Sequence, residues 1–126
     1  KIARQNFKFD SNKLDNIGRY LGVGRKLPHT GAHLWRSCLA GDPKSWRLMR
    51  RYNAQDVVLL ERIYQKLKPW HKNHPNLNLY TGNDSNCPTC QSPNIRMRGL
   101  NYGKAVVRQR LLCKDCGASF SGNAVK

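Results

Sequence analysis

Two pairs of closely spaced cysteines constrain the fold of this chain more than any other feature. Cys87 and Cys90 form one CxxC pair, and Cys113 and Cys116 form a second pair after 22 intervening residues. Each pair can lie on a tight turn that points two sulfurs at one ion, and the stretch between them is long enough for a β-hairpin with its turn at residues 101–103. Four thiolates leave no position open for a substrate, so the pattern predicts one structural zinc ion.

Two disulfides are the alternative use of these four cysteines. They would require an oxidising compartment, which nothing else in the sequence indicates. A module of about 40 residues also buries too little apolar surface to fold readily without its metal. We therefore assign residues 81–126 to a four-cysteine zinc ribbon, and we expect Cys38, outside both pairs, to be an ordinary buried thiol.

The charge of the chain favours a polyanionic partner. Twenty-three Lys and Arg against seven Asp and Glu give a formal net charge of +16, which points most simply to nucleic acid. The ribbon residues expected to contact it are Arg96, Arg98, Tyr102, Lys104, Arg108, Arg110 and Lys114. The arginines alternate at strand period, so each pair is expected on one sheet face beside the tyrosine, where phosphates and one stacked base could bind. A solvated hairpin is the alternative interpretation.

Residues 42–70 are expected to form a long helix or a pair of helices. Asp42 followed by Pro43 is typical of a helix start, and Pro69 excludes the residue before it from the helical region. The apolar residues expected to form one buried face recur at three-and-four spacing: Val57, Leu60, Tyr64 and Leu67.

Tyr52 and Asp56 lie four residues apart within this helix, so both side chains project from the same side. A carboxylate one turn from a phenol, in a strongly basic chain, is what a metal-and-water site on nucleic acid could use. The alternative is a surface aspartate beside a half-buried tyrosine.

The other segments predict short helices and connecting loops. One helix is expected after a cap at Ser11, ending at Gly22, and another over residues 33–39. Residues 71–84 have the polar composition of a connector, so we place the domain boundary after residue 80. No apolar run approaches the roughly 20 residues that a membrane span needs, and nothing resembles a secretion signal.

In combination these stretches resemble the C-terminal half of phage and bacterial ribonuclease-H-like 3′–5′ exonucleases, the DnaQ-like (DEDD) proofreading superfamily. The matching stretches are SNKLDNIGRYLGVGRK, HTGAHLW, GDPKSWRLMRRYNAQDV, LKPW followed by NHPN, and the cysteine pairs. The resemblance implies an α+β chain. Residues 1–80 would be the mainly helical C-terminal half of a ribonuclease-H-like α/β fold without its N-terminal strands, and residues 81–126 a small β zinc ribbon.

The resemblance also implies a chemistry. The tyrosine and aspartate of the family's third exonuclease motif are catalytic and fall on Tyr52 and Asp56. Asp56 would bind one of two Mg²⁺ or Mn²⁺ ions, and Tyr52 would orient the attacking water. Lys26 and His29 are expected to face the substrate, which we expect to be DNA, in the cytoplasm of a bacterium or a phage-infected cell and away from membranes.

The chain departs from the family in its carboxylates. The other three metal-binding carboxylates of these enzymes lie upstream, in an Asp-x-Glu strand and an Asp-bearing segment that this sequence lacks. One carboxylate cannot hold two ions, so we expect residues 1–126 to be inactive until a missing N-terminal half or a partner chain completes the sheet. The chain is then either part of a metal-dependent 3′–5′ exonuclease or a non-catalytic zinc-ribbon module that binds nucleic acid or recruits partners in a phage replication or recombination complex.

Overall fold

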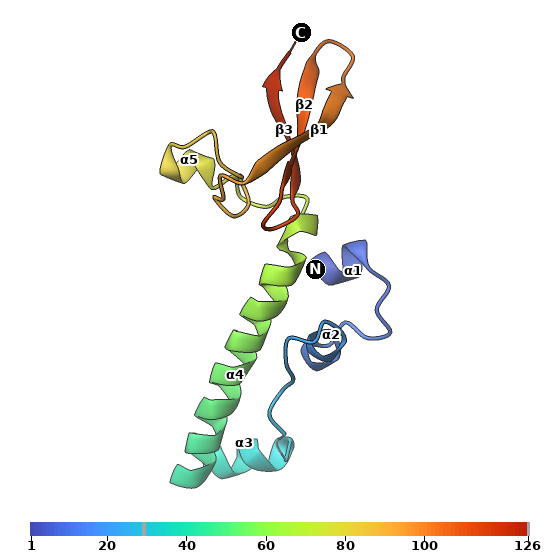
Figure 1. Ribbon diagram of the computed structural model, residues 1–126. Helices are drawn as coiled ribbons and strands as arrows, with labels where there is room; N and C mark the ends of the chain where they lie inside the picture. The colour runs from blue at the N-terminus through green and yellow to red at the C-terminus, as the bar shows by residue number, and fades with distance from the viewer. Residues whose placement is uncertain (29, 126) are drawn as a thin grey trace. The chain divides into compact units, whose positions relative to one another are not determined.

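A computed structural model describes residues 1–28 and 30–125 (Figure 1). The helices are α1 (Ile2–Asn6), α2 (Leu14–Tyr20), α3 (Ala32–Leu39), α4 (Pro43–Leu67), the 3₁₀ turn η1 (Lys68–Trp70) and α5 (Asn78–Thr81). The strands β1 (Ile95–Tyr102), β2 (Val107–Cys113) and β3 (Ser119–Ala124) form one antiparallel sheet in the order β1-β2-β3. The expected α+β class is confirmed, whereas the ribonuclease-H-like fold stays a prediction. Within the described ranges, no helix is both long and apolar enough to cross a membrane.

The chain divides into two compact units, one that takes in Ala3–Lys66 and one that continues from Leu67. The segment before the ribbon groups with the ribbon, because the N–H of Leu77 donates to the carbonyl oxygen of Pro88 at 2.9 Å. Compactness does not test which part folds alone, so the division into domains 1–80 and 81–126 stays a prediction.

Both ends of α4 lie where the sequence predicts them. The carboxylate of Asp42 accepts hydrogen bonds from the hydroxyl of Ser45 at 2.6 Å and from its backbone N–H at 2.9 Å. These bonds lower the pKa of Asp42 and satisfy a donor that the first helical turn leaves without a partner. The helix ends at Leu67, two residues before Pro69.

The buried face of α4 is not the expected one. Val57 and Leu60 are 66% and 57% exposed, and of the four expected residues only Leu67 is buried. Leu59 and Ile63 are buried instead. Both sets recur at helical spacing, so periodicity alone could not choose between them.

Gly18 of α2 explains which stripe is covered. A Cβ at this position would lie 2.8 Å from Cδ1 of Leu59 and 2.7 Å from the carbonyl oxygen of Gly24. Only glycine lets α2 and the loop that follows it approach α4 this closely. At the other end of the unit, Cys38 of α3 is buried against Met49, as expected of a structural thiol, where α3 crosses the start of α4 in Figure 1.

The hairpin turn lies later than residues 101–103, where we expected it. Tyr102 still belongs to β1, where it pairs with Val107. The turn is closed by the N–H of Gly103, which donates to the carbonyl oxygen of Val106 at 3.0 Å. The strand therefore extends through the position that the sequence analysis gave to the turn.

Candidate functional site

The four cysteines of the two CxxC pairs come together at one point. Their sulfur atoms all lie within 4.8 Å of one another, with 3.7 Å between Cys87 and Cys116 and 3.6 Å between Cys90 and Cys113. Tetrahedral zinc with Zn–S bonds of about 2.3 Å sets its sulfur ligands about 3.8 Å apart, whereas a disulfide bond is about 2 Å long. The tetrad could therefore hold a metal ion, and its geometry is consistent with structural zinc.

Two matching turns build this cluster. The N–H of Gln91 donates to the carbonyl oxygen of Cys87 at 2.9 Å, and the N–H of Gly117 donates to that of Cys113 at 3.0 Å. Gln91 and Gly117 both have a positive φ, 64° and 80°, so each turn ends in the left-handed conformation that folds the chain back around the sulfurs.

Asp115 holds the two turns to each other. Its carboxylate accepts hydrogen bonds from the hydroxyl of Ser92 and, at 2.9 Å, from the side-chain amide of Asn94. The bond from Ser92, followed by that from Asn94, lowers the pKa of Asp115. This carboxylate is therefore part of the scaffold of the cysteine cluster.

The thiols of the cluster differ in acidity when no metal is bound. Burial raises the pKa of Cys116 and of Cys90. Burial also acts on Cys113, but the backbone N–H groups of Cys116 and Asp115 outweigh it and lower the pKa of this thiol to about 7. Since a metal binds thiolates, its binding releases protons, and the cluster binds it less well as the pH falls.

Three arginines share one face of the sheet. Arg108 and Arg110 lie two residues apart on β2, and Arg96 of β1 pairs with Leu112, two residues further along β2. Side chains two residues apart on a strand, and those of paired residues, project from the same face. Because all three arginines are exposed, they form a continuous basic surface, which we call the arginine face.

Tyr102 and Arg98, which we expected beside these arginines, do not share the arginine face. Tyr102 pairs with Val107, one residue away from the arginine register, so it belongs to the opposite face of the sheet. Arg98 lies at an irregularity in the β1–β2 register, so strand alternation no longer places it with Arg96. The extended strand and this irregularity could not be read from the sequence. Lys104 and Lys114 are exposed and lie outside the strands.

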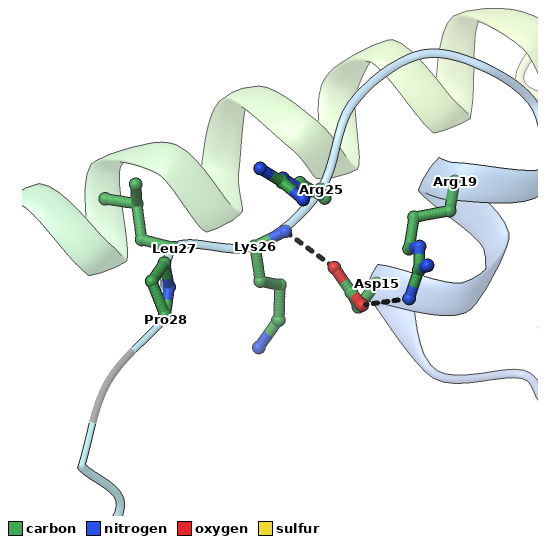
Figure 2. Close-up of a pocket in the computed structure, with 6 residues that line it drawn as sticks. All are labelled: Asp15, Arg19, Arg25, Lys26, Leu27 and Pro28. Atoms are coloured by element: carbon green, nitrogen blue, oxygen red, sulfur yellow. Dashed lines mark hydrogen bonds and ion pairs between the residues drawn. The ribbon is translucent and has the colours of Figure 1, made fainter.

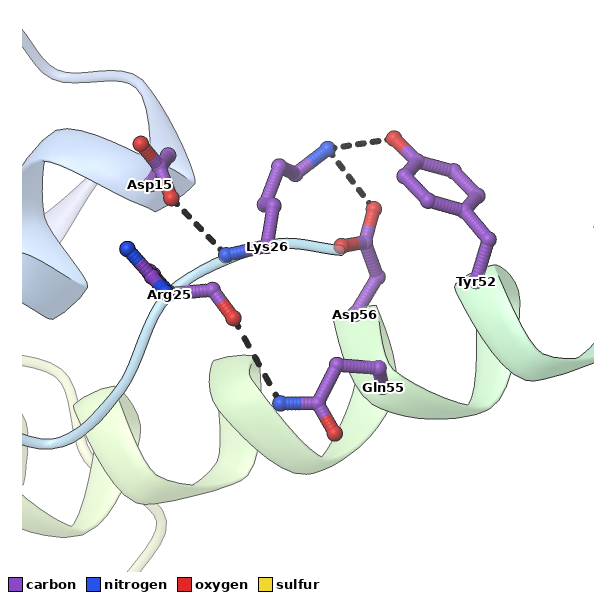
Figure 3. A network of polar contacts seen from close by, with 6 residues as sticks. All are labelled: Asp15, Arg25, Lys26, Tyr52, Gln55 and Asp56. Carbon is purple, nitrogen blue, oxygen red and sulfur yellow. Dashed lines mark hydrogen bonds and ion pairs between the residues drawn. The ribbon is translucent and has the colours of Figure 1, made fainter. Parts of the chain in front are cut away.

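Tyr52 and Asp56 lie on the same side of α4, as their spacing predicts, and both contact the side chain of Lys26 (Figure 3). The Nζ atom of Lys26 donates to the hydroxyl of Tyr52 at 2.6 Å and lies 2.7 Å from Oδ2 of Asp56. The bond to Asp56 and then the bond to Tyr52 raise the pKa of Lys26. Lys26, expected to face the substrate, thus lies between the two candidate catalytic groups.

The loop that carries Lys26 is held from both sides. Its backbone N–H donates to Oδ1 of Asp15 in α2 at 2.8 Å, and the side-chain amide of Gln55 in α4 donates to the carbonyl oxygen of Arg25 at 3.4 Å (Figure 3). Gln55 was missed by the sequence analysis, because nothing in its local pattern points to a loop about 30 residues away in the chain.

An open hollow of about 500 Å³ lies beside this network (Figure 2). It is lined by Asp15, Arg19, Arg25, Lys26, Leu27 and Pro28. The lining carries three cationic residues and one carboxylate, although the ammonium of Lys26 pairs with Asp56 and Arg19 lies 3.9 Å from Asp15. The small net positive charge that is left favours an anion such as a phosphate. His29, which we expected to face the substrate, lies outside the described residues.

The described residues supply one ligand of the expected Mg²⁺ or Mn²⁺ site. Oδ1 of Asp56 is buried and has no hydrogen-bond partner within the described ranges, as a carboxylate awaiting a cation would be. In the same ranges, however, only the cysteine tetrad brings three or more metal-binding side chains together. A two-metal site would therefore need carboxylates from outside residues 1–126.

Comparisons of this chain with protein-family models, with curated proteins and with solved structures found no match.

Proposed function

We propose that this chain is the C-terminal portion of a metal-dependent 3′–5′ exonuclease that acts on DNA, followed by a zinc ribbon that binds the nucleic acid. The observation that carries the proposal is the convergence of Tyr52 and Asp56 on one cation, with the second oxygen of Asp56 buried and without a hydrogen-bond partner among the residues that the structure describes. A phenol, a carboxylate and a positive charge in contact are the groups that hydrolysis of a phosphodiester uses.

The residues of the network have separate roles in this proposal. Asp56 would bind a divalent cation, and the hydroxyl of Tyr52 would hydrogen-bond the attacking water. Lys26 balances the charge of Asp56 in the free protein, and its ammonium would contact a substrate phosphate when a metal neutralises that carboxylate. Mg²⁺ or Mn²⁺, when bound, would activate the water and stabilise the leaving 3′ oxygen.

The remaining carboxylates would come from a preceding segment of the natural protein or from a partner chain. An exposed apolar stripe on α4 supports this, because Val57 and Leu60 lie on the helix surface next to the face that carries Asp56. Contiguous exposed apolar residues are typical of a surface that another element covers. A strand that packed on this stripe would bring its own side chains close to Asp56.

The ribbon would contribute binding affinity. We propose that the ion in its tetrad is zinc, which four thiolates favour. Arg96, Arg108 and Arg110 would contact phosphates, which gives binding that depends on salt and not on sequence. Replacing Arg108 and Arg110 with alanine should weaken binding to all strands and reduce its salt dependence. A loss confined to one sequence would contradict this role.

The nuclease proposal is tested with the natural full-length protein and a strand labelled at either end. We expect Mn²⁺-dependent shortening from the 3′ end, reduced at least 100-fold by Asp56→Asn. Glu61→Gln removes an exposed carboxylate five residues further along the same helix and should leave the rate unchanged. Equal rates in wild type and Asp56→Asn would refute the proposal.

The second candidate function is a non-catalytic zinc-ribbon module that binds nucleic acid. It is favoured by the single carboxylate at the Tyr52 site within the described residues. The two functions separate in the same assay, because the binding module would retain the strand and leave both of its ends intact.

A further inference from the structure

The second unit contains a groove of about 370 Å³ to which the proposed function gives no role. We call it the amide groove. It lies between the segment that carries α5 and the sheet, and the lining residues on which the inference rests are Asn78, Gln109, Leu111, Phe120, Gly122 and Asn123. Its volume is at the small end of the range for ligand pockets, about 300 Å³ and upward, so it suits a single small ring system.

The groove opens on the face of the sheet opposite the arginine face. Leu111 of β2 pairs with Phe120 of β3, and Leu111 lies one residue along from Arg110. Since neighbouring side chains on a strand project to opposite faces, the groove and the arginines use different surfaces. Contacts in the groove can therefore be removed without removing the contacts that the arginines make with phosphates.

An apolar floor is fixed to the metal cluster. Phe120 is half-buried, packs against the cluster of buried Cys87, Cys113 and Ala118, and also lines the groove. Leu111 lies opposite it and is also half-buried. An aromatic side chain that is fixed by such packing and partly accessible from a groove is a surface on which a planar base can stack.

Glycine at position 122 lets the side chains of Leu111 and Gln109 lie directly against the backbone of β3. A Cβ there would lie 2.8 Å from Cδ1 of Leu111 and 3.1 Å from Oε1 of Gln109. The two atoms therefore lie together beside a position with no side chain. An apolar surface and an amide oxygen thus meet in the same part of the groove.

Two amides at the groove differ in how they are used. The side chain of Asn78 is buried and occupied, since it donates to the carbonyl oxygen of Asn86 at 3.0 Å and accepts from Gln91 at 2.6 Å. The half-buried side-chain amide of Gln109 has no hydrogen-bond partner among residues 1–28 and 30–125. A glutamine amide presents one acceptor beside donors, and the edge of a nucleobase presents the complementary pair.

We propose that the amide groove receives one unstacked base of a single-stranded nucleic acid. The base stacks on Phe120 and Leu111, and its hydrogen-bonding edge pairs with the amide of Gln109. This inference rests on the proposed nucleic-acid role of the ribbon, and it adds a contact to a base where the arginine face provides only contacts to phosphates. Recognition of splayed bases by an aromatic surface and amide hydrogen bonds is a general mode of single-strand binding.

The test uses the zinc-loaded chain of residues 1–126 and two fluorescent single strands of equal length, one with all its bases and one made of abasic sugar-phosphate. Base stacking on an aromatic side chain predicts about tenfold tighter binding of the strand with bases. Gln109→Leu keeps the stacking surface and removes the hydrogen bonds of the amide, so it should reduce this preference by about threefold and leave the affinity for the abasic strand unchanged. Arg108→Ala, the matched control on the other face, should weaken binding of both strands by the same factor.

The outcomes of this binding test distinguish failure of the base pocket from failure of the proposed nucleic-acid role. Equal binding of the two strands by the wild type overturns the base pocket and leaves the nucleic-acid role standing, whereas no binding of either strand overturns both. If Gln109→Leu weakens both strands equally, Gln109 does not contact a base.

A measurement on the wild type alone guards against a misfolded variant. The side-chain amide resonances of Gln109 should shift in the nuclear magnetic resonance spectrum with the strand that has bases and stay in place with the abasic strand. Adenosine monophosphate tests for a free nucleotide. If it binds as tightly as the strand, the occupant is a nucleotide and the proposal is wrong.

Discussion

Removing the ammonium of Lys26 tests whether the network at the candidate catalytic site is formed. Lys26→Met keeps an unbranched side chain that is one atom shorter, and it removes the charge and the hydrogen bonds of Lys26. The substitution leaves Asp56, whose side chain is only 24% exposed, without the cation that lies 2.7 Å from Oδ2. Its other oxygen, Oδ1, is already buried without a hydrogen-bond partner in the described ranges, so the substitution leaves this carboxylate without a described ion-pair partner.

The burial of the pair sets the expected magnitude. Side chains of exposed ion pairs couple by about 0.2–1 kcal/mol, and breaking a buried pair costs about 3–5 kcal/mol. Lys26 is 31% exposed and Asp56 24% exposed, which lies between these limits. We therefore expect a coupling free energy of about 1.5 kcal/mol between the two side chains.

A double-mutant cycle measures this coupling. The free energy of unfolding in urea is measured for the wild type, Lys26→Met, Asp56→Asn and the double variant, all saturated with zinc. Tryptophan fluorescence is a suitable probe, because two of the three tryptophans, at positions 35 and 46, belong to the unit that holds Lys26 and Asp56. Lys66→Met, the same change at an exposed position of α4, is the control and should show no coupling. A coupling below about 0.3 kcal/mol between Lys26 and Asp56 would refute the network.

The difference in the free energy of unfolding between the wild type and Lys26→Met should also depend on pH, and the direction of that dependence can be predicted. Contacts with Asp56 and Tyr52 raise the pKa of Lys26 above its ordinary value of 10.5. A raised pKa stabilises the protein fully below the ordinary value, and the stabilisation is lost as the pH rises through the folded-state pKa. The difference between wild type and Lys26→Met should thus be constant from about pH 7 to 9 and shrink above about pH 10.5.

Three further predictions concern the scaffold. Each chain should release one zinc ion when a thiol reagent blocks the cysteines, and chelation should abolish the circular dichroism of the sheet while the helical signal of the first unit remains. Chains free of zinc with two disulfides would contradict the metal cluster. Gly18→Ala should lower the free energy of unfolding by about 1–3 kcal/mol, because the new methyl group overlaps Leu59. An unchanged midpoint of urea unfolding would contradict the close approach of α2 to α4. Asp42→Asn should reduce the loss of stability in acid, because the hydrogen bonds of the cap lower the pKa of Asp42 from 3.8. The contribution of Asp42 to the free energy of unfolding is present above that value and disappears as the pH falls through the folded-state pKa. Identical acid unfolding curves for the wild type and Asp42→Asn would argue against the cap.

Local chemistry was readable from the sequence, and choices made by tertiary packing were not. Asp42 at the start of α4 and the two CxxC turns depend on atoms within a few residues, so their patterns predicted them. The stripe of α4 that is buried depends on Gly18, more than 40 residues from Leu59, and two apolar stripes of equal periodicity were available. The periodicity of apolar residues within α4 contains no information on that distant glycine.

The sheet shows the same division. Alternation correctly paired Arg108 with Arg110, because both lie on one regular strand. It misplaced Tyr102, because the strand continues past the expected turn and carries an irregularity in its register. Bulges and turn positions depend on the partner strand, which no pattern within one strand contains.

The proposed nuclease site requires above all that Asp56 holds a divalent cation. Calorimetric titration of Mn²⁺ into the zinc-loaded natural full-length protein tests it without relying on catalysis. We expect Asp56→Asn to weaken Mn²⁺ binding at least tenfold and Glu61→Gln to leave it unchanged. A Mn²⁺ isotherm for Asp56→Asn that matches the wild type would contradict the claim.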